Sequence, residues 1–440
     1  MSANKLFGNS ASAKFLTTKQ TGVGLQQPEP AQKRRKSRFR PLKISLILLV
    51  ILECLYCIAI FSNIPFIVRL RNMYIETAMS TMSHHWLAEA FIPKDIIDAV
   101  VADMAAARDA QMGISSTWTK PTAPTGPENT GPTPPAHTNP AQTERTLTAE
   151  QRAFFELYWE IDQDSMFSYV EKNPAAVAKG WDRIKINEAG LDDSGTSIRT
   201  TMGEQVLAID VENQILLVRV KGATYRGVLA IAKDPSRLHL FPSSSIGSYG
   251  QRAGTIAANN GGILAMTGSG FIDEGGTGNG GALAGAAMCD GKKYGKHFGW
   301  GYKRIELRED DRMYITDASN SYSDGTTDAV EFTPALIVDS EIIVDASSGY
   351  TSMNPRACLG QSNRGEVLML VIEGRFLNSM GTDVMECADI LALHDCAQAL
   401  NLDGGTSAIL WYDGEYVTRC SNTAIPEGRT LPNAWVYTGE

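Results

Sequence analysis

The chain has 440 residues and 43% of them are hydrophobic, which is enough for roughly two or three units of about 100 to 200 residues and a sizeable buried core. Its formal net charge is −9 and its sequence pI is about 5.3. This acidic balance argues against nucleic acid as a partner, because phosphate backbones bind basic surfaces and the only basic cluster lies in the N-terminal tail.

The first predicted element is an apolar segment from Ile44 to Val68, in which Glu53 is the only acidic residue. A helix needs about 20 apolar residues to cross a bilayer, so this segment is long enough. Basic residues are frequent in residues 33–43 and only Arg69 and Arg71 follow directly, which places the N-terminus in the cytoplasm. No small-residue cleavage site follows, so we predict a retained anchor and not a removed signal peptide. Residues 1–43 then form a cytoplasmic basic tail, residues 44–68 a single-pass transmembrane anchor in the cell membrane, and the C-terminal domain is extracellular.

A helical stalk and a linker are predicted after the anchor. Apolar residues such as Ile75, Met79 and Val100 recur at helical spacing, so residues 69–113 are predicted to form the helical stalk. Residues 114–146 are dense in Pro and Thr and nearly free of aliphatic side chains, and such a composition cannot bury enough surface to fold. We predict a disordered Pro/Thr-rich linker that acts as a semi-stiff spacer between the membrane and the following domain.

Residues 147–440 are predicted to form one folded domain. A helical pattern covers residues 148–172, where Thr148 and Gln151 fit a capping box. Short β-rich segments and Asp-Gly turn pairs follow, which predict strands and hairpins. These strands are expected at residues 206–211, 215–220 and 227–232, and the turns at Asp290-Gly291 and Asp413-Gly414.

The C-terminal part of this domain shows a strand, a helix and a second strand. The strand over residues 367–372 is entirely apolar, Asp383 caps a helix that reaches Ala399, and a strand over residues 399–402 follows. This order predicts a crossover helix and a mixed sheet. Because strands outnumber helices, the predicted fold class is α+β, a mixed β-sheet domain with crossover helices.

Cysteine and histidine usage limits the chemistry. Cys54 and Cys57 lie in the apolar segment, and the five remaining cysteines are an odd number, so most are expected to be buried thiols, with one or two disulfides left open. The histidines are scattered without metal-ligand spacing, so we expect no cofactor and no dedicated metal site, with calcium on oxygen ligands left open. They occupy positions 84, 85, 137, 239, 297 and 394.

A glycine-rich stretch runs from Asn259 to Gly285. Glycine lets backbone amides approach a ligand closely, and successive amides can form an anion-binding nest. An ordinary surface loop explains the glycines equally well. No Gly-Lys-Ser/Thr sequence follows, so a nucleotide-binding P-loop is excluded.

Charged residues at the ends of predicted strands are the next candidates. Arg356 and Arg375 carry donors in a fixed fork that suits phosphate, although each alone fits a surface ion pair as well. Asp403 follows a buried strand and precedes Gly404 and Gly405, so its carboxylate is either a rigidly held, open functional group or part of an ordinary turn.

Taken together and in this order, these pieces resemble the phosphodiester glycosidase family over roughly residues 203–440. The sequence departs from the family pattern at Thr406, where a third glycine is usual, at Glu373, where aspartate is common, and at residues 263–264, where aromatic residues usually follow Asn-Gly-Gly. These departures leave the substrate preference open. The resemblance is carried by Asn260-Gly261-Gly262, the loop 273–281, Asn354-Pro355-Arg356, Glu373-Gly374-Arg375, the helix start at residues 381–386, Asn401-Leu402-Asp403-Gly404-Gly405 and Glu427-Gly428-Arg429.

The resemblance implies hydrolysis of a sugar-1-phosphodiester in envelope or exopolysaccharide metabolism. Asp403 would activate water or stabilise positive charge on the sugar, Arg356 would bind phosphate, and Glu373 and Asp273 are candidates for a second carboxylate. The partners expected are a phosphorylated glycan or sugar-1-phosphodiester and, through the anchor, the membrane. Two alternatives stay open: a non-catalytic protein of envelope-polysaccharide binding or assembly, and a phosphodiesterase that cleaves P–O. The substrate-binding residues implied are Asn260, Gly261, Gly262, Asp273, Arg375, Asn401, Gly404 and Gly405.

Overall fold

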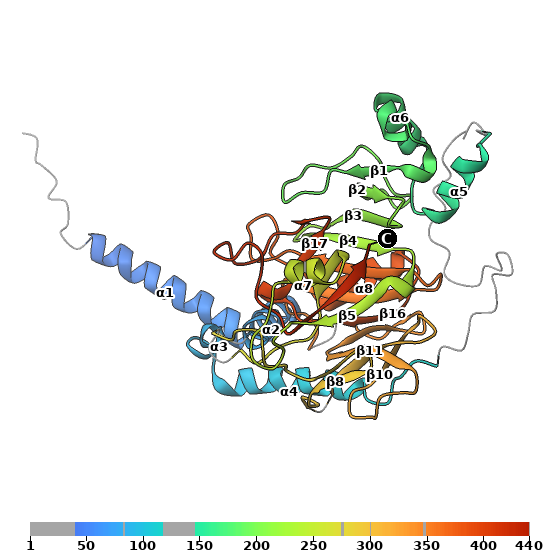
Figure 1. The fold of residues 1–440 in the computed structure, drawn as a ribbon. Coiled ribbons are helices and arrows are strands. Elements are labelled where there is room, and N and C mark those ends of the chain that lie inside the picture. The colour runs from blue at the N-terminus through green and yellow to red at the C-terminus, as the bar shows by residue number, and fades with distance from the viewer. Residues whose placement is uncertain are drawn as a thin grey trace, which may run out of the picture. The chain divides into compact units, whose positions relative to one another are not determined.

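The computed structural model describes residues 40–81, 84–117, 146–273, 277–299, 301–345 and 349–439 (Figure 1). The chain divides into two units, Met1–Cys57 and Ile58–Glu440. Helix α1 (Arg40–Phe61) contains a stretch, Leu42–Phe61, that is long and apolar enough to cross a membrane. The helix predicted over residues 44–68 therefore ends at Phe61, and helix α2 (Pro65–Met79) is separate. Pro65 favours this break, because its ring removes a backbone donor and disfavours helical geometry at the residue before it.

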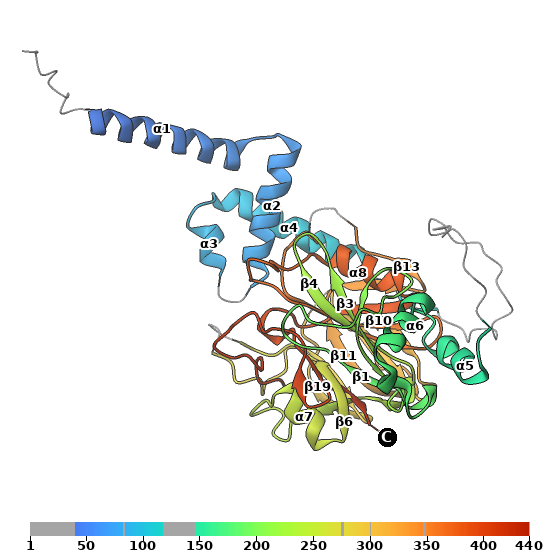
Figure 2. The same cartoon turned by 90° about the horizontal axis from the view of Figure 1, so that it is seen from above.

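Helices α2, α3 (His85–Glu89) and α4 (Lys94–Ala110) occupy the region predicted as a stalk. They lie side by side within the second unit (Figure 2). Their common core includes the buried side chains of Ile75, Ala88 and Ile97. Helical structure in this region is confirmed.

The chain after α4 stays within the second unit. The Gln111 side chain donates to the Ala335 carbonyl at 2.9 Å and accepts from the Ala335 amide at 3.1 Å. The Ser116 amide donates to the Ile315 carbonyl at 2.8 Å. Residues 118–145 of the predicted linker lie outside the described residues, but both flanks of the linker belong to one compact unit. The linker therefore joins two parts of that unit, which does not fit its predicted role as a spacer.

The helix predicted over residues 148–172 is two helices, α5 (Ala149–Leu157) and α6 (Gln163–Lys172). The capping box between Thr148 and Gln151 is present. Asp162 caps the second helix by accepting from the Ser165 amide at 2.8 Å, which provides an independent helix start that the continuous pattern had hidden.

A nine-stranded sheet forms the centre of the second unit, in the order β1-β2-β3-β4-β15-β14-β16-β12-β13. Three of the predicted strands are β2, β3 and β4, and the apolar strand is β15. The bounds are β1 (Lys185–Asn187), β2 (Gln205–Asp210), β3 (Ile215–Lys221), β4 (Arg226–Ala232), β12 (Ala335–Val338), β13 (Glu341–Ile342), β14 (Arg356–Ser362), β15 (Val367–Ile372) and β16 (Cys396–Asn401).

Two five-stranded sheets complete the β-structure, in the orders β10-β9-β11-β7-β8 and β18-β17-β6-β19-β5. Both predicted Asp-Gly hairpins are present, with positive φ at Asp290 and Asp413. The bounds are β5 (Leu238–Pro242), β6 (Gly262–Thr267), β7 (Ala286–Cys289), β8 (Lys292–Gly295), β9 (Lys303–Arg308), β10 (Met313–Asp317), β11 (Thr326–Phe332), β17 (Leu410–Tyr412), β18 (Glu415–Tyr416) and β19 (Asn433–Thr438).

The predicted crossover helices are confirmed, but the predicted mixture of parallel and antiparallel strand pairs is wrong. Helix α8 (Val384–Leu393) links β15 to β16, and helix α7 (Ala253–Asn259) links β5 to β6. In each case the two linked strands run in the same direction with one antiparallel strand between them, β14 or β19. Every pairing between the named strands of the described chain is therefore antiparallel, although the fold remains α+β.

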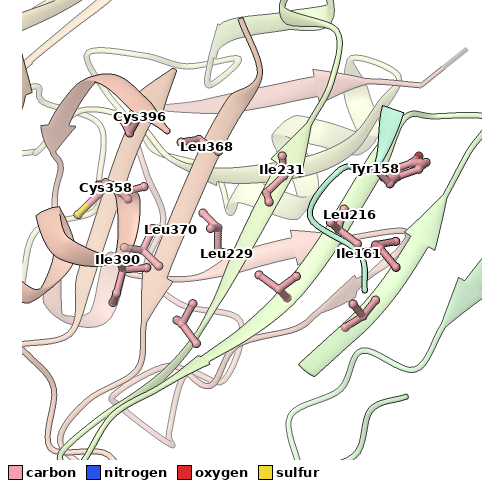
Figure 3. Close-up of a cluster of buried hydrophobic side chains, with 14 of the residues drawn as sticks. Tyr158, Ile161, Leu216, Leu229, Ile231, Cys358, Leu368, Leu370, Ile390 and Cys396 are labelled. Atoms are coloured by element: carbon pink, nitrogen blue, oxygen red, sulfur yellow. The ribbon is translucent and has the colours of Figure 1, made fainter. Parts of the chain in front are cut away.

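The side chains of the nine-stranded sheet alternate between two apolar cores, as expected for strands with both faces covered. On one face Leu216, Leu229 and Leu370 pack with Tyr158 and Ile390 beneath the helices (Figure 3). On the other face, alternate residues of the same strands pack against the two smaller sheets. The cysteines described in the folded unit are buried free thiols: Cys289, Cys358, Cys387, Cys396 and Cys420.

Candidate active site

The loop that carries Asp403 passes closely over the Asn354–Arg356 segment. Strand β16 ends at Asn401, and the amide of Gly405 donates to the carbonyl of Pro355 at 3.1 Å. A Cβ atom on Gly404 would lie 2.5 Å from that same carbonyl oxygen, and Gly405 has a φ of +59°. Both glycines are therefore required for the path of this loop. The Asn-Pro-Arg and Asp-Gly-Gly pieces predicted from sequence do meet.

Asp403 lies among many protein atoms but keeps part of its side chain accessible to water. Burial raises the pKa of this carboxyl to about 6, although a hydrogen bond with Ser407 and the charge of Arg429 oppose the rise. Desolvation penalises the charged form, which is the usual cause of such a shift. A carboxyl group with this pKa can exchange a proton near neutral pH, as general acid–base chemistry requires.

Arg429 is held next to Asp403 by an ion pair with Asp273. Its Nη1 and Nη2 atoms lie 2.9 and 3.0 Å from the two carboxylate oxygens, and Nη2 also donates to the Gly278 carbonyl at 2.6 Å. The guanidinium stacks over the Phe271 ring at 4.9 Å. The hydrogen bonds of the pair lower the pKa of Asp273 and raise that of Arg429. The sequence-predicted Asp273 therefore belongs to this site.

Arg375 approaches the same loop from another side. Its Nη2 atom lies 3.5 Å from the position that a Cβ atom on Gly405 would take. Surrounding atoms lower the pKa of its guanidinium, while its side chain remains accessible to water. Within the described residues no carboxylate lies at ion-pair distance from it. The Cys420 thiol interacts with the charges of both Arg375 and Arg429, so the two guanidinium groups lie around one loop.

The Arg356 side chain, in contrast, is bonded to the supporting backbone. Its Nε atom donates to the Thr382 carbonyl at 3.1 Å, and Nη2 donates to the carbonyl and hydroxyl oxygens of Ser352 at 2.6 and 2.9 Å. Burial lowers the pKa of this guanidinium. The backbone of Arg356 thus lies next to the Asp403 loop, while the guanidinium of Arg356 donates its hydrogen bonds to residues 352 and 382.

Glu373 is in a buried ion-pair network. Its side chain is 1% exposed, and its carboxylate lies 3.3 Å from Arg226 Nε and 2.7 Å from Arg419 Nε. It also accepts from the Arg419 amide at 2.9 Å. These partners give Glu373 a structural role within the buried network.

The predicted Asn260-Gly261-Gly262 element is not near Asp403. The Asn260 side chain donates to the Ile256 carbonyl at the end of α7, and Gly262 begins β6, while Asp273 follows the other end of that strand. Six residues of strand span roughly 20 Å, so these ends are well separated. The sequence that does lie just before Asp273 is a glycine followed by an aromatic residue, Gly270-Phe271.

Asn401 and the glycine-rich loop have structural partners. The Asn401 side chain donates to the Thr333 carbonyl at 2.8 Å and is buried within β16. The amides of Gly278 and Gly281 donate to Asp273 and to Asn279 of the same loop. Glycines 275 and 276 lie outside the described residues. The backbone amides of residues 278 and 281 thus donate hydrogen bonds within the loop.

Sequence reasoning missed three residues around Asp403. Arg429 was noted only as part of Glu427-Gly428-Arg429, and that piece was the available clue. Ser407 forms the hydrogen bond to Asp403, and Tyr302 interacts with the Asp403 charge, which together with burial raises the pKa of its hydroxyl. No sequence pattern marks Tyr302, because strand pairing of a distant segment brings it to the site.

In this α+β unit, a carboxyl group with a pKa of about 6 lies near Arg429, and Arg375 approaches the loop that carries it. Residues 253–438 match the model of the phosphodiester glycosidase family. A curated relative is the SPbeta prophage-derived uncharacterized protein YomE of Bacillus subtilis strain 168, which is 25% identical over 171 residues, or 36% of this chain. The match spans about a quarter, 26%, of that relative's length.

Three solved structures that are similar to the chain have TM-scores below 0.5. The catalytic domain of zebrafish N-acetylglucosamine-1-phosphodiester α-N-acetylglucosaminidase, auto-inhibited by its pro-peptide, has a TM-score of 0.42 and 15% identity, covering 51% of this chain and 82% of that one. A hypothetical protein from Synechocystis has a TM-score of 0.37 and 14% identity, covering 52% and 63%. A putative exported protein of Burkholderia pseudomallei K96243 has a TM-score of 0.37 and 14% identity, covering 49% and 74%.

Proposed function

We propose that the second unit hydrolyses a sugar-1-phosphodiester, with Asp403 as the carboxylate that activates water or stabilises positive charge on the sugar ring. The observation that carries this proposal is the carboxyl of Asp403, whose pKa is raised to about 6 next to Arg429. The match of residues 253–438 to the phosphodiester glycosidase family model supports the reaction class. A phosphodiester leaving group is a weak base, so one essential carboxylate is enough for this mechanism.

The phosphate is proposed to bind between Arg375 and Arg429. Asp273 neutralises much of the charge of Arg429, so Arg375 supplies most of the uncompensated positive charge at the loop. An accessible guanidinium can make two parallel charge-assisted bonds to phosphate oxygens. Arg356 then takes a positioning role, because its donors hold the backbone under the Asp403 loop. This assignment replaces direct phosphate binding by Arg356.

The cellular setting is also part of the proposal. Helix α1 is proposed to anchor the chain in the cell membrane with the basic tail in the cytoplasm, because basic residues precede the apolar helix and few follow it. The catalytic unit would then act outside the cytoplasm on a phosphorylated glycan of the envelope or of an exopolysaccharide. The acidic balance of the chain suits such an exposed unit.

The test is turnover of a panel of sugar-1-phosphodiesters by the purified full-length protein, with Asp403→Asn as the inactive control. Release of the free sugar by wild type alone supports the proposal. In oxygen-18 water, the label should enter the sugar, whereas label in the phosphate would show P–O cleavage and contradict the glycosidase mechanism. Tight binding without turnover by both proteins would favour the non-catalytic alternative.

A further inference from the structure

The C-terminal half of α2 holds the segment that supports the candidate site. The Glu76 carboxylate is fully buried and accepts from the amide of Gly349 at 2.9 Å and from the amide and hydroxyl of Thr351 at 2.7 and 3.0 Å. The Thr77 hydroxyl accepts from the Met353 amide at 3.0 Å. Residues 349–353 lead directly to Pro355, whose carbonyl supports Gly405. Helix α2 is therefore linked to the Asp403 loop through these hydrogen bonds and the backbone of residues 353–355.

The N-terminal half of the same helix exposes apolar side chains. Phe66, Leu70 and Tyr74 are 70%, 44% and 44% exposed, and their spacing of four residues places them on one side of α2. Trp86 and Phe91, at 57% and 59% exposed, belong to α3 and the residues after it. The Tyr74 hydroxyl donates to the Leu87 carbonyl at 2.9 Å, which joins the two helices. These five side chains are called the aromatic face.

We propose that the aromatic face binds the surface of the lipid bilayer and holds the candidate site there, so that the substrate phosphodiester is carried by a membrane lipid. The substrate part of this inference rests on the proposed hydrolysis; the binding of the face to lipid rests only on the proposed anchor. Phe, Tyr and Trp are the side chains that favour the boundary between headgroups and acyl chains. Arg69 is exposed on the same half of α2 and adds a charge that attracts anionic headgroups.

The chain length between the apolar helix and the site supports this surface. Only Ser62, Asn63 and Ile64 separate α1 from α2. At about 3.5 Å per extended residue and 1.5 Å per helical residue, the stretch from Phe61 to Glu76 spans at most about 30 Å. Residues 349–353 bind Glu76 and Thr77, so they cannot be much farther than this from the end of the apolar helix.

The Pro/Thr-rich linker cannot lengthen this connection. It follows α4, and residues 111–116 before it already bind Ala335 and Ile315 of the folded unit. Residues after it form α5, which packs in the core of the same unit. The site is thus tied to the membrane end of the chain through α2 and not through a flexible spacer. A substrate carried by a lipid in the outer surface of the same membrane is therefore favoured.

Lipid binding is tested with the full-length protein reconstituted in vesicles that contain phospholipids brominated on the acyl chain. Trp86 fluorescence, obtained as the difference between wild type and Trp86→Phe, should be quenched strongly. The control is Trp86→Phe with Val101→Trp, which places the reporter on α4 outside the aromatic face and should show little quenching. Equal, weak quenching at both positions would overturn the proposal, as would cross-linking that shows two copies of the chain joined through this face.

The substrate class is tested by turnover in the same vesicles. The double variant Phe66→Ser, Leu70→Ser should lose about tenfold in rate on a lipid-linked sugar phosphodiester and keep its rate on a water-soluble one. Val101→Ser is the matched control and should keep both rates. Equal rates of wild type and double variant on the lipid-linked substrate would contradict the membrane-borne substrate. If wild type hydrolyses neither substrate, the proposed function fails, and Trp86 quenching still decides whether the face binds lipid.

Discussion

The carbonyl oxygen of Pro355 accepts a hydrogen bond from the amide of Gly405 at 3.1 Å, which joins two distant sequence pieces into one support for Asp403. Gly374 packs on Pro355 from another side, since a Cβ atom there would lie 2.8 Å from the Pro355 nitrogen. The loop with Asp403 and the turn with Arg375 thus rest on the same proline. Their spacing depends on residues that contribute no catalytic group.

Replacement of Gly404 by alanine should displace the Asp403 loop. The new Cβ atom would lie 2.5 Å from the Pro355 oxygen, so the backbone must move, at a cost of about 1 to 3 kcal/mol in the free energy of unfolding. We expect a lower thermal midpoint together with a large loss of kcat. Gly299→Ala is the control, because its Cβ would meet open space. An unchanged kcat in Gly404→Ala would show that the loop position is not critical.

The rate should follow the ionisation of Asp403. Its pKa of about 6 means that the carboxylate is depleted below pH 6, so kcat/KM should fall about tenfold per pH unit below that value and level off above it. Asp403→Asn should lower kcat by about 100-fold or more at pH 7. A rate profile measured from pH 4 to pH 8 checks both statements. A profile that falls as pH rises through 6 would assign the protonated form instead.

The same shift predicts a pH-dependent effect on stability. The pKa of Asp403 is raised on folding from 3.8 to about 6, so the folded state holds the proton more tightly and its stability falls as pH rises from about 4 to about 6. Asp403→Asn removes this penalty, which is at most roughly 3 kcal/mol and less because water reaches the group. The variant should exceed wild type in thermal midpoint at pH 8 by more than at pH 4. An equal difference at both pH values would contradict the shift.

Local patterns predicted most of the strands and the helix starts. The apolar run that became β15, the capping box at Thr148 and the Asp413-Gly414 turn each have a cause within a few residues, which a sequence displays directly. The break after Phe61 and the division of residues 148–172 into two helices were missed, since continuous apolar patterns covered both.

Tertiary contacts could not be predicted in the same way. The bonds of Gln111 to Ala335 join residues more than 200 positions apart and leave no pattern in the sequence. Arg429 reaches Asp403 through the pairing of β19 with β6, and the register of that pairing is set by the whole sheet. The placement of Asn260 in the site was inferred from the resemblance alone, and the length of β6 separates it from Asp273.

Arg375 and Arg356 should respond differently to replacement by alanine. Arg375 has no ion-pair partner among the described residues, so Arg375→Ala should leave the thermal midpoint nearly unchanged and raise KM for the phosphodiester. Arg356→Ala removes three hydrogen bonds to residues 352 and 382, so it should lower the midpoint. Calorimetry and steady-state kinetics on both variants separate the two roles. A raised KM in Arg356→Ala with an unchanged midpoint would return phosphate binding to Arg356.

Glu373 was expected to be a catalytic carboxylate, and its structural partners predict a different outcome. Glu373→Gln keeps the size of the side chain but removes the charge between Arg226 and Arg419; Arg226 keeps its ion pair with Asp193, while Arg419 loses its carboxylate partner. Loss of one partner from a buried ion pair costs about 3 to 5 kcal/mol, so denaturant unfolding should show a marked loss of stability. The folded fraction should keep its pH–rate profile, because the ionising group of the reaction is Asp403. If Glu373→Gln instead removes one limb of the profile while stability is retained, Glu373 takes part in proton transfer and the structural interpretation is wrong.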